Sequence, residues 1–140
     1  MPSQFELDSM YMGAALLHAR MSKAVRAKVG ACLVTTQGVM LGGVNGQPAG
    51  LSNECEYLDE EENLVTKSST IHAETNAILR AAKEGVSCLG ATMYVTLSPC
   101  VPCSAMLVNA GIKELVYNQD YRDSGGIGLL REAGVKVRKF

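Results

Sequence analysis

Three side chains of this sequence have the types and the spacing of zinc ligands. His72 opens the tripeptide HAE at 72–74, and Cys100 and Cys103 lie in the segment SPCVPC at 98–103. One His and two Cys fill three corners of a tetrahedral site and leave the fourth to water, which is typical of catalytic rather than structural zinc. Glu74 is not needed as a ligand. The sequence therefore predicts a catalytic zinc ion, with Glu74 as the group that moves protons.

Each ligand segment is expected at the start of a helix. Cys100 and Cys103 lie on the same side of a first helical turn, for which Ser98 is a suitable N-cap and Pro99 a suitable first residue. Thr70 is the expected cap of a second helix over 71–84. Both helices then direct the positive ends of their dipoles at one cation, which favours thiolates.

The CxxC pair also allows a redox site or half of a structural zinc site. A structural site needs a fourth ligand, for which Cys32, Cys55, Cys88 and His18 remain. Cys32 lies in an apolar run and is expected in the core, Cys55 and Cys88 are expected to be ordinary thiols, and His18 a surface or interface residue. A non-catalytic zinc-binding module is thus the alternative in a different class, and such a module has no need of Glu74.

Composition bounds the class of protein. The length of 140 residues predicts one domain over 1–140. The odd count of five cysteines argues against a disulfide framework and favours a reducing, cytoplasmic compartment, which is the host cytoplasm if the chain is viral. The start of the chain is not expected to be a signal peptide, and no run is apolar enough for a membrane span. A net charge of −1 argues against nucleic acid as a partner.

The pattern of apolar residues predicts alternating helices and strands, and therefore a layered α/β domain. A short Gln37–Gly38 turn makes the first two strands a hairpin and the sheet mixed. A long polar segment over 45–69 is expected to be a functional or mobile loop. The expected helices are 4–21, 71–84, 100–110 and 126–133, and the expected strands are 29–36, 38–44, 92–97, 113–117 and 135–137.

Several segments resemble the deoxycytidylate (dCMP) deaminase family of the cytidine-deaminase superfamily, most closely its phage and bacterial members. HAE and PCxxC are shared with cytidine, guanine and tRNA adenosine deaminases, whereas NGQPAG at 45–50 and AGIK at 110–113 are similar to the nucleotide branch. The resemblance runs almost from end to end, through 28–32, 43–50, 72–78, 91–100, 109–113 and 138–140. It implies a three-layer α/β/α fold with a central mixed five-stranded sheet.

The resemblance also implies the reaction. In zinc nucleobase deaminases, zinc-activated hydroxide attacks C4 of cytosine while the glutamate of HxE, here Glu74, shuttles protons. The family converts dCMP to dUMP, which supplies thymidylate synthesis. By the same resemblance, Asn45 is expected to contact the sugar hydroxyl, and the Ala73 amide and the Ser98 carbonyl are expected to contact the base edge.

A nucleotide substrate also needs contacts to its phosphate. Cations and hydroxyls near the motifs are the candidates, although each is otherwise an ordinary solvated residue. These candidates are Ser22, Lys23, Arg26, Tyr121 and Arg122. The alternatives within the superfamily are deamination of dCTP, with Mg²⁺ on the triphosphate, and action on a nucleoside, a free base or tRNA.

The resemblance also concerns regulation and assembly. The family usually has Tyr where Val44 stands, in a loop linked to allosteric triphosphate binding, so activation by dCTP and inhibition by dTTP stay open here. Gly43, Val44 and Gly46 are the possible regulatory residues of this loop. Lys83 is expected at a subunit interface close to a nucleotide phosphate, as in phage members. A homo-oligomer is implied, and a hexamer is favoured.

Overall fold

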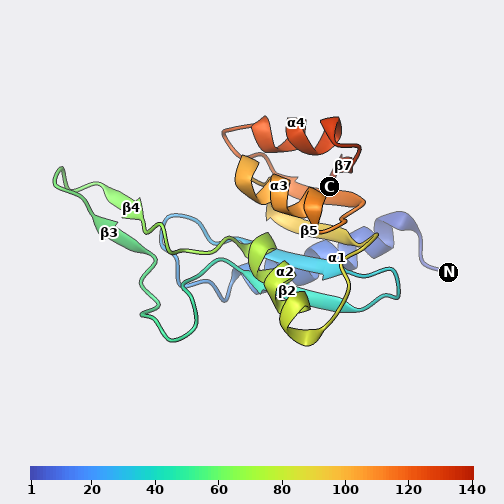
Figure 1. Cartoon of the computed structure of the whole chain (residues 1–140), viewed down its shortest axis with the longest axis horizontal. Coiled ribbons are helices and arrows are strands. Elements are labelled where there is room, and N and C mark those ends of the chain that lie inside the picture. Colours follow the sequence, from blue (N-terminus) through green and yellow to red (C-terminus); the bar gives the residue numbers. More distant parts are fainter.

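A mixed sheet of five strands lies at the centre of the computed structural model, which describes residues 1–140 (Figure 1). The strand order is β2-β1-β5-β6-β7, in which β1 is antiparallel to β2 and β5, whereas β5, β6 and β7 are parallel. This confirms the predicted fold class. The elements are α1 Gln4–Ala19, β1 Gly30–Val34, β2 Met40–Val44, β3 Glu56–Leu58, β4 Leu64–Thr66, α2 Ala73–Glu84, β5 Thr92–Leu97, α3 Val101–Asn109, β6 Glu114–Gln119, α4 Gly125–Glu132 and β7 Lys136–Lys139.

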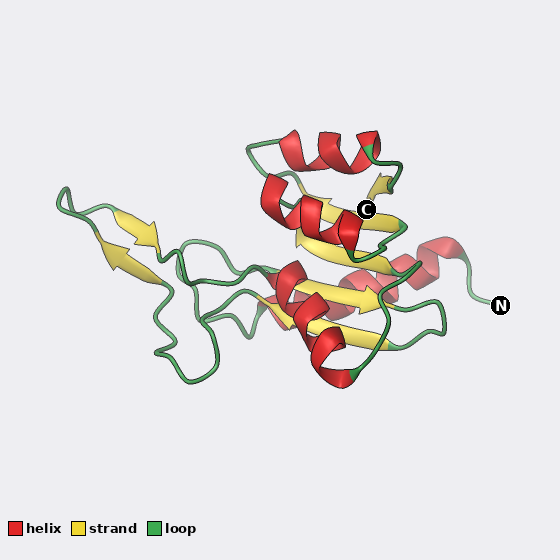
Figure 2. Cartoon of the chain, viewed as in Figure 1, coloured by secondary structure: helices red, strands yellow, loops and turns green.

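Different helices bury the two faces of the sheet, because side chains alternate between faces along each strand. Leu33 and Met93 pack on one face in a core cluster that α2, α3 and α4 complete. Cys32 and Tyr94 pack on the other face against α1. Figure 2 shows the sheet between these helices. No helix combines the length and the apolar character that crossing a membrane would need.

A two-stranded hairpin extends from the body between β2 and α2 (Figures 1 and 2). We call residues 56–66 the arm. Its strands pair Glu56 with Thr66, and Asp59 accepts hydrogen bonds from the backbone N–H groups of Glu61 and Asn63 in the turn. The prediction of a loop over 45–69 was therefore wrong for the arm, because strands of three residues are too short to give a recognisable alternation.

Helices α2 and α3, which carry the motif, begin later than the predicted caps Thr70 and Ser98 implied. His72 is the N-cap of α2 and Cys100 is the N-cap of α3, and neither makes a side-chain capping hydrogen bond. The assignments of Thr70 and Ser98 as caps were wrong, since both hydroxyls bond to backbone groups of other segments. The first N–H groups of both helices consequently have no side-chain cap. At its other end α2 stops at Gly85, whose φ of 69° is left-handed.

A partly buried ion pair joins residues near the two ends of the chain. Arg138 donates to both oxygens of Asp8, at 2.7 and 3.1 Å, and to Glu114 at 2.8 Å. Tyr94 donates its hydroxyl to Asp8 at 2.7 Å. The hydrogen bonds from Arg138 are the main reason why the pKa of Asp8 is lowered to about 2. This network fixes α1 against β6 and β7.

Candidate metal centre and nucleotide cavity

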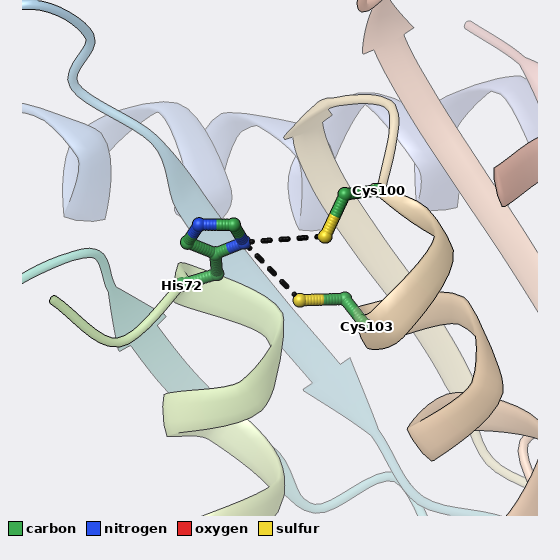
Figure 3. A group of neighbouring side chains, drawn as sticks. All are labelled: His72, Cys100 and Cys103. Atoms are coloured by element: carbon green, nitrogen blue, oxygen red, sulfur yellow. Dashed lines mark hydrogen bonds between the residues drawn. The ribbon is translucent and has the colours of Figure 1, made fainter. Parts of the chain in front are cut away.

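The three predicted zinc ligands meet at one point (Figure 3). Nδ1 of His72 lies 3.2 Å from Sγ of Cys103 and 3.4 Å from Sγ of Cys100. The donor atoms of all three residues lie within 4.8 Å of one another. The sequence separates His72 from the cysteines by a helix and a strand, so the sheet order brings them together.

This donor set fits zinc. Zn–S bonds of about 2.3 Å and Zn–N bonds of about 2.0–2.1 Å at tetrahedral angles put N and S ligands about 3.5 Å apart. The separations of 3.2 and 3.4 Å are close to that value. Two sulfurs and one imidazole nitrogen are also the ligand types that zinc prefers. The geometry leaves one tetrahedral position without a protein ligand, as in a catalytic site.

The environment of Cys103 indicates why a cation is needed. Burial raises the pKa of the Cys103 thiol, and the nearby Glu74 carboxylate raises it further. A thiolate at this buried position therefore requires compensating positive charge, which a divalent ion supplies. Cys100 and Cys103 are the N-cap and third residue of α3, where the helix dipole acts in the same direction. The hydroxyl of Thr75 lies 3.4 Å from Sγ of Cys103 and adds a weak hydrogen bond.

Glu74 lies beside the metal ligands without belonging to them. It occupies the first turn of α2, is 3% exposed, and has Oε1 4.0 Å from Nδ1 of His72. Its side chain also lines the adjacent cavity. A carboxylate in this place reaches both a ligand on the metal and a substrate in the cavity, which is the position that a proton shuttle needs.

A cavity of about 310 Å³ opens next to the metal centre. Its walls come from the start of α2, from the residues that follow β5 and β6, from the segment between α1 and β1, and from the arm. Ligands commonly bind beyond the carboxyl ends of parallel strands, and β5 and β6 follow that rule here. Its lining residues include Arg26, Asn45, Glu56, Thr66, Ala73, Glu74, Ser98, Tyr121 and Arg122.

The three residues expected to contact base and sugar all line this cavity. Ala73 is the first residue of α2, so its N–H has no partner within the helix. Ser98 follows β5, and its hydroxyl accepts the N–H of Tyr121 at 2.7 Å. Asn45 donates to the carbonyl of Ala27 at 2.8 Å and accepts from the N–H of Val29 at 2.9 Å. Its amide keeps one N–H and one lone pair for another partner.

The five phosphate candidates divide into two groups. Arg26, Tyr121 and Arg122 line the cavity, and the guanidinium of Arg122 lies 5.4 Å from the centre of the Tyr121 ring. Ser22 and Lys23 do not line it. Ser22 is 2% exposed and donates its hydroxyl to the Asn45 carbonyl at 3.0 Å, so it has a structural role in the wall. Lys23 lies in a separate shallow depression beside the arm.

Sequence reasoning missed the contribution of the arm to the cavity. Glu56 and Thr66, one cross-strand pair of the arm, both line it. Glu56 accepts hydrogen bonds from the N–H groups of Val25 and Arg26, both at 2.9 Å. The sequence pattern that could have predicted the two strands of the arm was weak. Tyr57 and the Val65-Thr66 pair are residues that favour strands, and they flank an acidic turn.

The possible regulatory residues do not line the cavity. Gly43 packs so closely on α2 that a Cβ there would overlap the Ala73 carbonyl, which is a structural reason for glycine. The Val44 carbonyl accepts from Asn76 at 2.8 Å, and Gly46 pairs with Ile71 through two backbone hydrogen bonds. Lys83 is exposed in the last turn of α2. At 1.5 Å per residue, it lies about 16 Å along the helix from His72.

The other potential ligands lie outside the metal centre. Cys32 and Cys55 are each 1% exposed, and burial raises the pKa of the Cys32 thiol to about 11. Cys88 is half-buried against the core. His18 bonds through Nδ1 to the Ala14 carbonyl at 2.9 Å on α1. The metal cluster is thus confined to His72, Cys100 and Cys103, and no fourth protein ligand completes a structural site.

Comparison with known proteins identifies the family. Residues 5–119 match the family model described as the cytidine and deoxycytidylate deaminase zinc-binding region. The deoxycytidylate deaminase of Enterobacteria phage T4 is 35% identical, with 88% of this chain and 84% of that protein covered. The human deoxycytidylate deaminase is 38% identical, with 96% of this chain and 80% of that protein covered.

A solved structure agrees with these sequence matches. The crystal structure of dCMP deaminase from the cyanophage S-TIM5 in complex with dCMP and dUMP has a TM-score of 0.90 to this chain. The two are 38% identical, and the match covers 99% of this chain and all of that one. The similarity to phage proteins confirms the resemblance found in the motifs. The chain belongs to the cytidine and deoxycytidylate deaminase family.

Proposed function

We propose that residues 1–140 form one zinc-dependent nucleotide deaminase domain, which hydrolyses dCMP to dUMP and ammonia. The observation that carries this proposal is the cavity, because Glu74, two of the metal ligands and two arginines all line it. A monophosphate nucleotide needs both features, one for its amino group and one for its phosphate. The relatives named deoxycytidylate deaminase, and the solved complex with dCMP and dUMP, support the same substrate.

Chemistry at C4 of the base depends on Glu74. A zinc ion held by His72, Cys100 and Cys103 supplies the Lewis acidity that makes water nucleophilic at neutral pH. Glu74 takes a proton from the attacking water and delivers it to N3 of the pyrimidine. It then takes the proton of the new hydroxyl at C4 and delivers it to the amino group, which leaves as ammonia while C4 becomes a carbonyl. One carboxylate serves all these transfers because its burial in the first turn of α2 holds it close to both reactants.

Backbone groups hold the base. The free N–H of Ala73, at the start of α2, donates to a carbonyl of the base, and the Ser98 carbonyl accepts from its amino group. Asn45 uses its remaining N–H for the sugar hydroxyl. Ala73 begins α2, and Asn45 and Ser98 directly follow β2 and β5, so these groups are held by the packed sheet and helix and orient C4 without a large entropy cost on binding.

Arg26, Tyr121 and Arg122 bind the 5′-phosphate in this proposal. Both guanidinium groups are permanently charged and offer paired donors to phosphate oxygens. Ser22 and Lys23 are left out because neither lines the cavity. A charge-assisted hydrogen bond contributes about 1.5–3 kcal/mol, so two of them favour dCMP over deoxycytidine by roughly a hundredfold or more in kcat/KM.

One assay tests the proposed function. Purified zinc-loaded protein is given deoxycytidine, dCMP, dCTP, CMP and guanine in turn, with and without magnesium, and ammonia release is measured. We expect dCMP to have the highest kcat/KM. Equal values for dCMP and deoxycytidine would contradict a phosphate site and would move the chain to the nucleoside branch. A higher value for dCTP with magnesium would make the triphosphate the substrate.

We propose that Gly43, Val44, Gly46 and Lys83 respond to a triphosphate bound outside the catalytic cavity, since none of these four residues lines it. Val44 replaces the usual Tyr of the loop over 43–46, which leaves the response to dCTP and dTTP to be measured. Activation curves at fixed dCMP, with either triphosphate added, test it. A flat curve for both would show that this chain lacks the regulation.

The oligomeric state and the cellular compartment are the remaining parts of the proposal. We propose a homo-oligomer, with a hexamer favoured, in the cytoplasm, or in the host cytoplasm for a viral chain. Exposed apolar side chains on α1 and on the arm support self-association, and five free cysteines support a reducing compartment. Analytical ultracentrifugation should give a mass well above the 14.9 kDa of one chain. A monomer at all concentrations would contradict the proposed homo-oligomer.

A further inference from the structure

Glu56 joins the arm to the cavity wall across thirty residues of sequence. Its Oε2 accepts hydrogen bonds from the backbone N–H groups of Val25 and Arg26, both at 2.9 Å. Glu56 and Arg26 also both line the cavity. The arm is therefore attached to the segment that places Arg26 at the cavity.

A second contact links the same two segments. Nη1 of Arg26 donates to Oγ1 of Thr66 at 3.1 Å, and Thr66 is the cross-strand partner of Glu56. One pair of residues on the arm thus holds both the backbone and the guanidinium of Arg26. The Glu56 carboxylate holds the backbone N–H of Arg26, and the Thr66 hydroxyl holds its guanidinium.

The segment around Arg26 has no regular structure of its own. Residues 22–29, between α1 and β1, belong to no helix or strand. Hydrogen bonds from backbone N–H groups to a carboxylate are short and strong compared with bonds between neutral groups. The arm also depends on such contacts, because a two-stranded hairpin alone is marginally stable. Each segment therefore gains order from the other.

We propose that Glu56 is a positioning residue, which together with Thr66 fixes Arg26 at the cavity wall and thereby sets the affinity for the phosphate of the substrate. The inference rests on the proposed function for the identity of that substrate. Glu56 does not touch the reacting atoms in this scheme. Its negative charge would by itself repel a phosphate, so its benefit comes from the geometry that it imposes on Arg26.

Four variants separate geometry from charge. Glu56→Ala removes both hydrogen bonds to the segment, whereas Glu56→Gln keeps an oxygen that can accept them and removes only the charge. Thr66→Val removes the bond to the guanidinium and preserves the shape of the side chain. Glu60→Ala is the matched control, because it removes an equal charge from the exposed turn of the arm, where Glu60 makes no side-chain hydrogen bond.

The first measurement is hydrogen exchange at the amides of Val25 and Arg26, which needs no substrate. We expect both amides to exchange about tenfold faster or more in Glu56→Ala, and at nearly the wild-type rate in Glu56→Gln and Glu60→Ala. Exchange that is equally fast in wild type and Glu56→Ala would overturn the inference. This readout stands even if dCMP is not the substrate, so failure here differs from failure of the proposed function.

The second measurement is the steady-state rate with dCMP on proteins of equal zinc content. We expect Glu56→Ala to raise KM about tenfold to a hundredfold, the range for one lost charge-assisted hydrogen bond, with kcat within about threefold of wild type. Thr66→Val should raise KM less, and Glu56→Gln should restore it to within about threefold. A wild-type KM in Glu56→Ala, or a Glu56→Gln variant as impaired as Glu56→Ala, would overturn the inference.

Discussion

The metal centre and the wall that faces it are built in different ways. His72, Cys100 and Cys103 sit at the starts of two helices that pack on the sheet, with Ala77 and Leu107 of those helices fully buried. The wall consists of residues 22–29, the arm and the residues after β6. It is held by a few side-chain hydrogen bonds between segments far apart in the sequence.

In the proposed function, the metal centre supplies reactivity and the wall supplies substrate choice. Zinc ligands must keep their geometry to within a few tenths of an ångström, and a close-packed core provides that precision. A wall of irregular segments and a hairpin tolerates substitution and insertion with less effect on the core. We therefore expect changes at the metal centre to abolish turnover and changes in the wall to alter which substrates bind.

The largest effect should come from Cys103→Ser. A neutral hydroxyl is a much weaker zinc ligand than a thiolate, so both zinc and activity should be lost to background. Elemental analysis and ammonia release measure the two losses. Cys88→Ser is the control, because Cys88 lies outside the cluster. A Cys103→Ser protein that keeps a full equivalent of zinc and its activity would refute the ligand assignment.

Glu74→Gln, also at the metal centre, should reduce turnover without reducing the binding of zinc or nucleotide. The amide keeps the size of the side chain but cannot take a proton, so kcat should fall by about 10²–10⁴-fold while zinc content and nucleotide binding persist. Glu84→Gln, at the exposed end of the same helix, should behave like wild type. Turnover of Glu74→Gln within about threefold of wild type would show that another group moves the protons.

A change in the wall should act on the substrate preference. Arg122→Ala removes a guanidinium that lines the cavity, so kcat/KM for dCMP should fall by about tenfold or more while the value for deoxycytidine stays within about threefold. Arg131→Ala, on the exposed side of α4, serves as the control. An equal loss with both substrates would mean that Arg122 supports the fold rather than the phosphate.

The smallest effect on activity should come from Asp8→Asn, which weakens the core far from the cavity. Since Arg138 lowers the folded-state pKa of Asp8 to about 2, the ionised form contributes stability at pH 7 that is lost as pH falls from about 4 toward 2. We expect Asp8→Asn to lower the free energy of unfolding by about 2 kcal/mol at pH 7 and by roughly half as much near pH 3.

Urea unfolding at both pH values measures this loss, with kcat for dCMP measured in parallel. Asp120→Asn is the control, because its partner Lys139 is exposed and surface ion pairs contribute little. A loss that is the same at pH 7 and pH 3 would show that the charge of Asp8 is not the cause. A large fall in kcat would show that a change in the core, far from the cavity, also impairs catalysis.

The sequence predicted most of the fold and the ligands of the metal, for identifiable reasons. β5 matches the predicted range 92–97, and α2 ends at the glycine expected to stop it. The zinc ligands were predictable because only a few residue types bind zinc and because HAE and PCxxC are short local patterns. The helix caps at Thr70 and Ser98 were wrong, since a hydroxyl before a helix has other partners available in the folded chain.

What the sequence determined by itself was therefore which residues make up the candidate metal centre, because the three ligands, the proposed proton shuttle Glu74 and the helices that hold them are local patterns of residue type and spacing. Only the tertiary structure decided how the wall of the cavity is assembled. Glu56 and Arg26 lie thirty residues apart and meet through a hairpin too short to recognise, and Ser22 proved to be buried beneath the wall. Contacts between distant irregular segments follow from packing of the whole chain, and no local pattern records them.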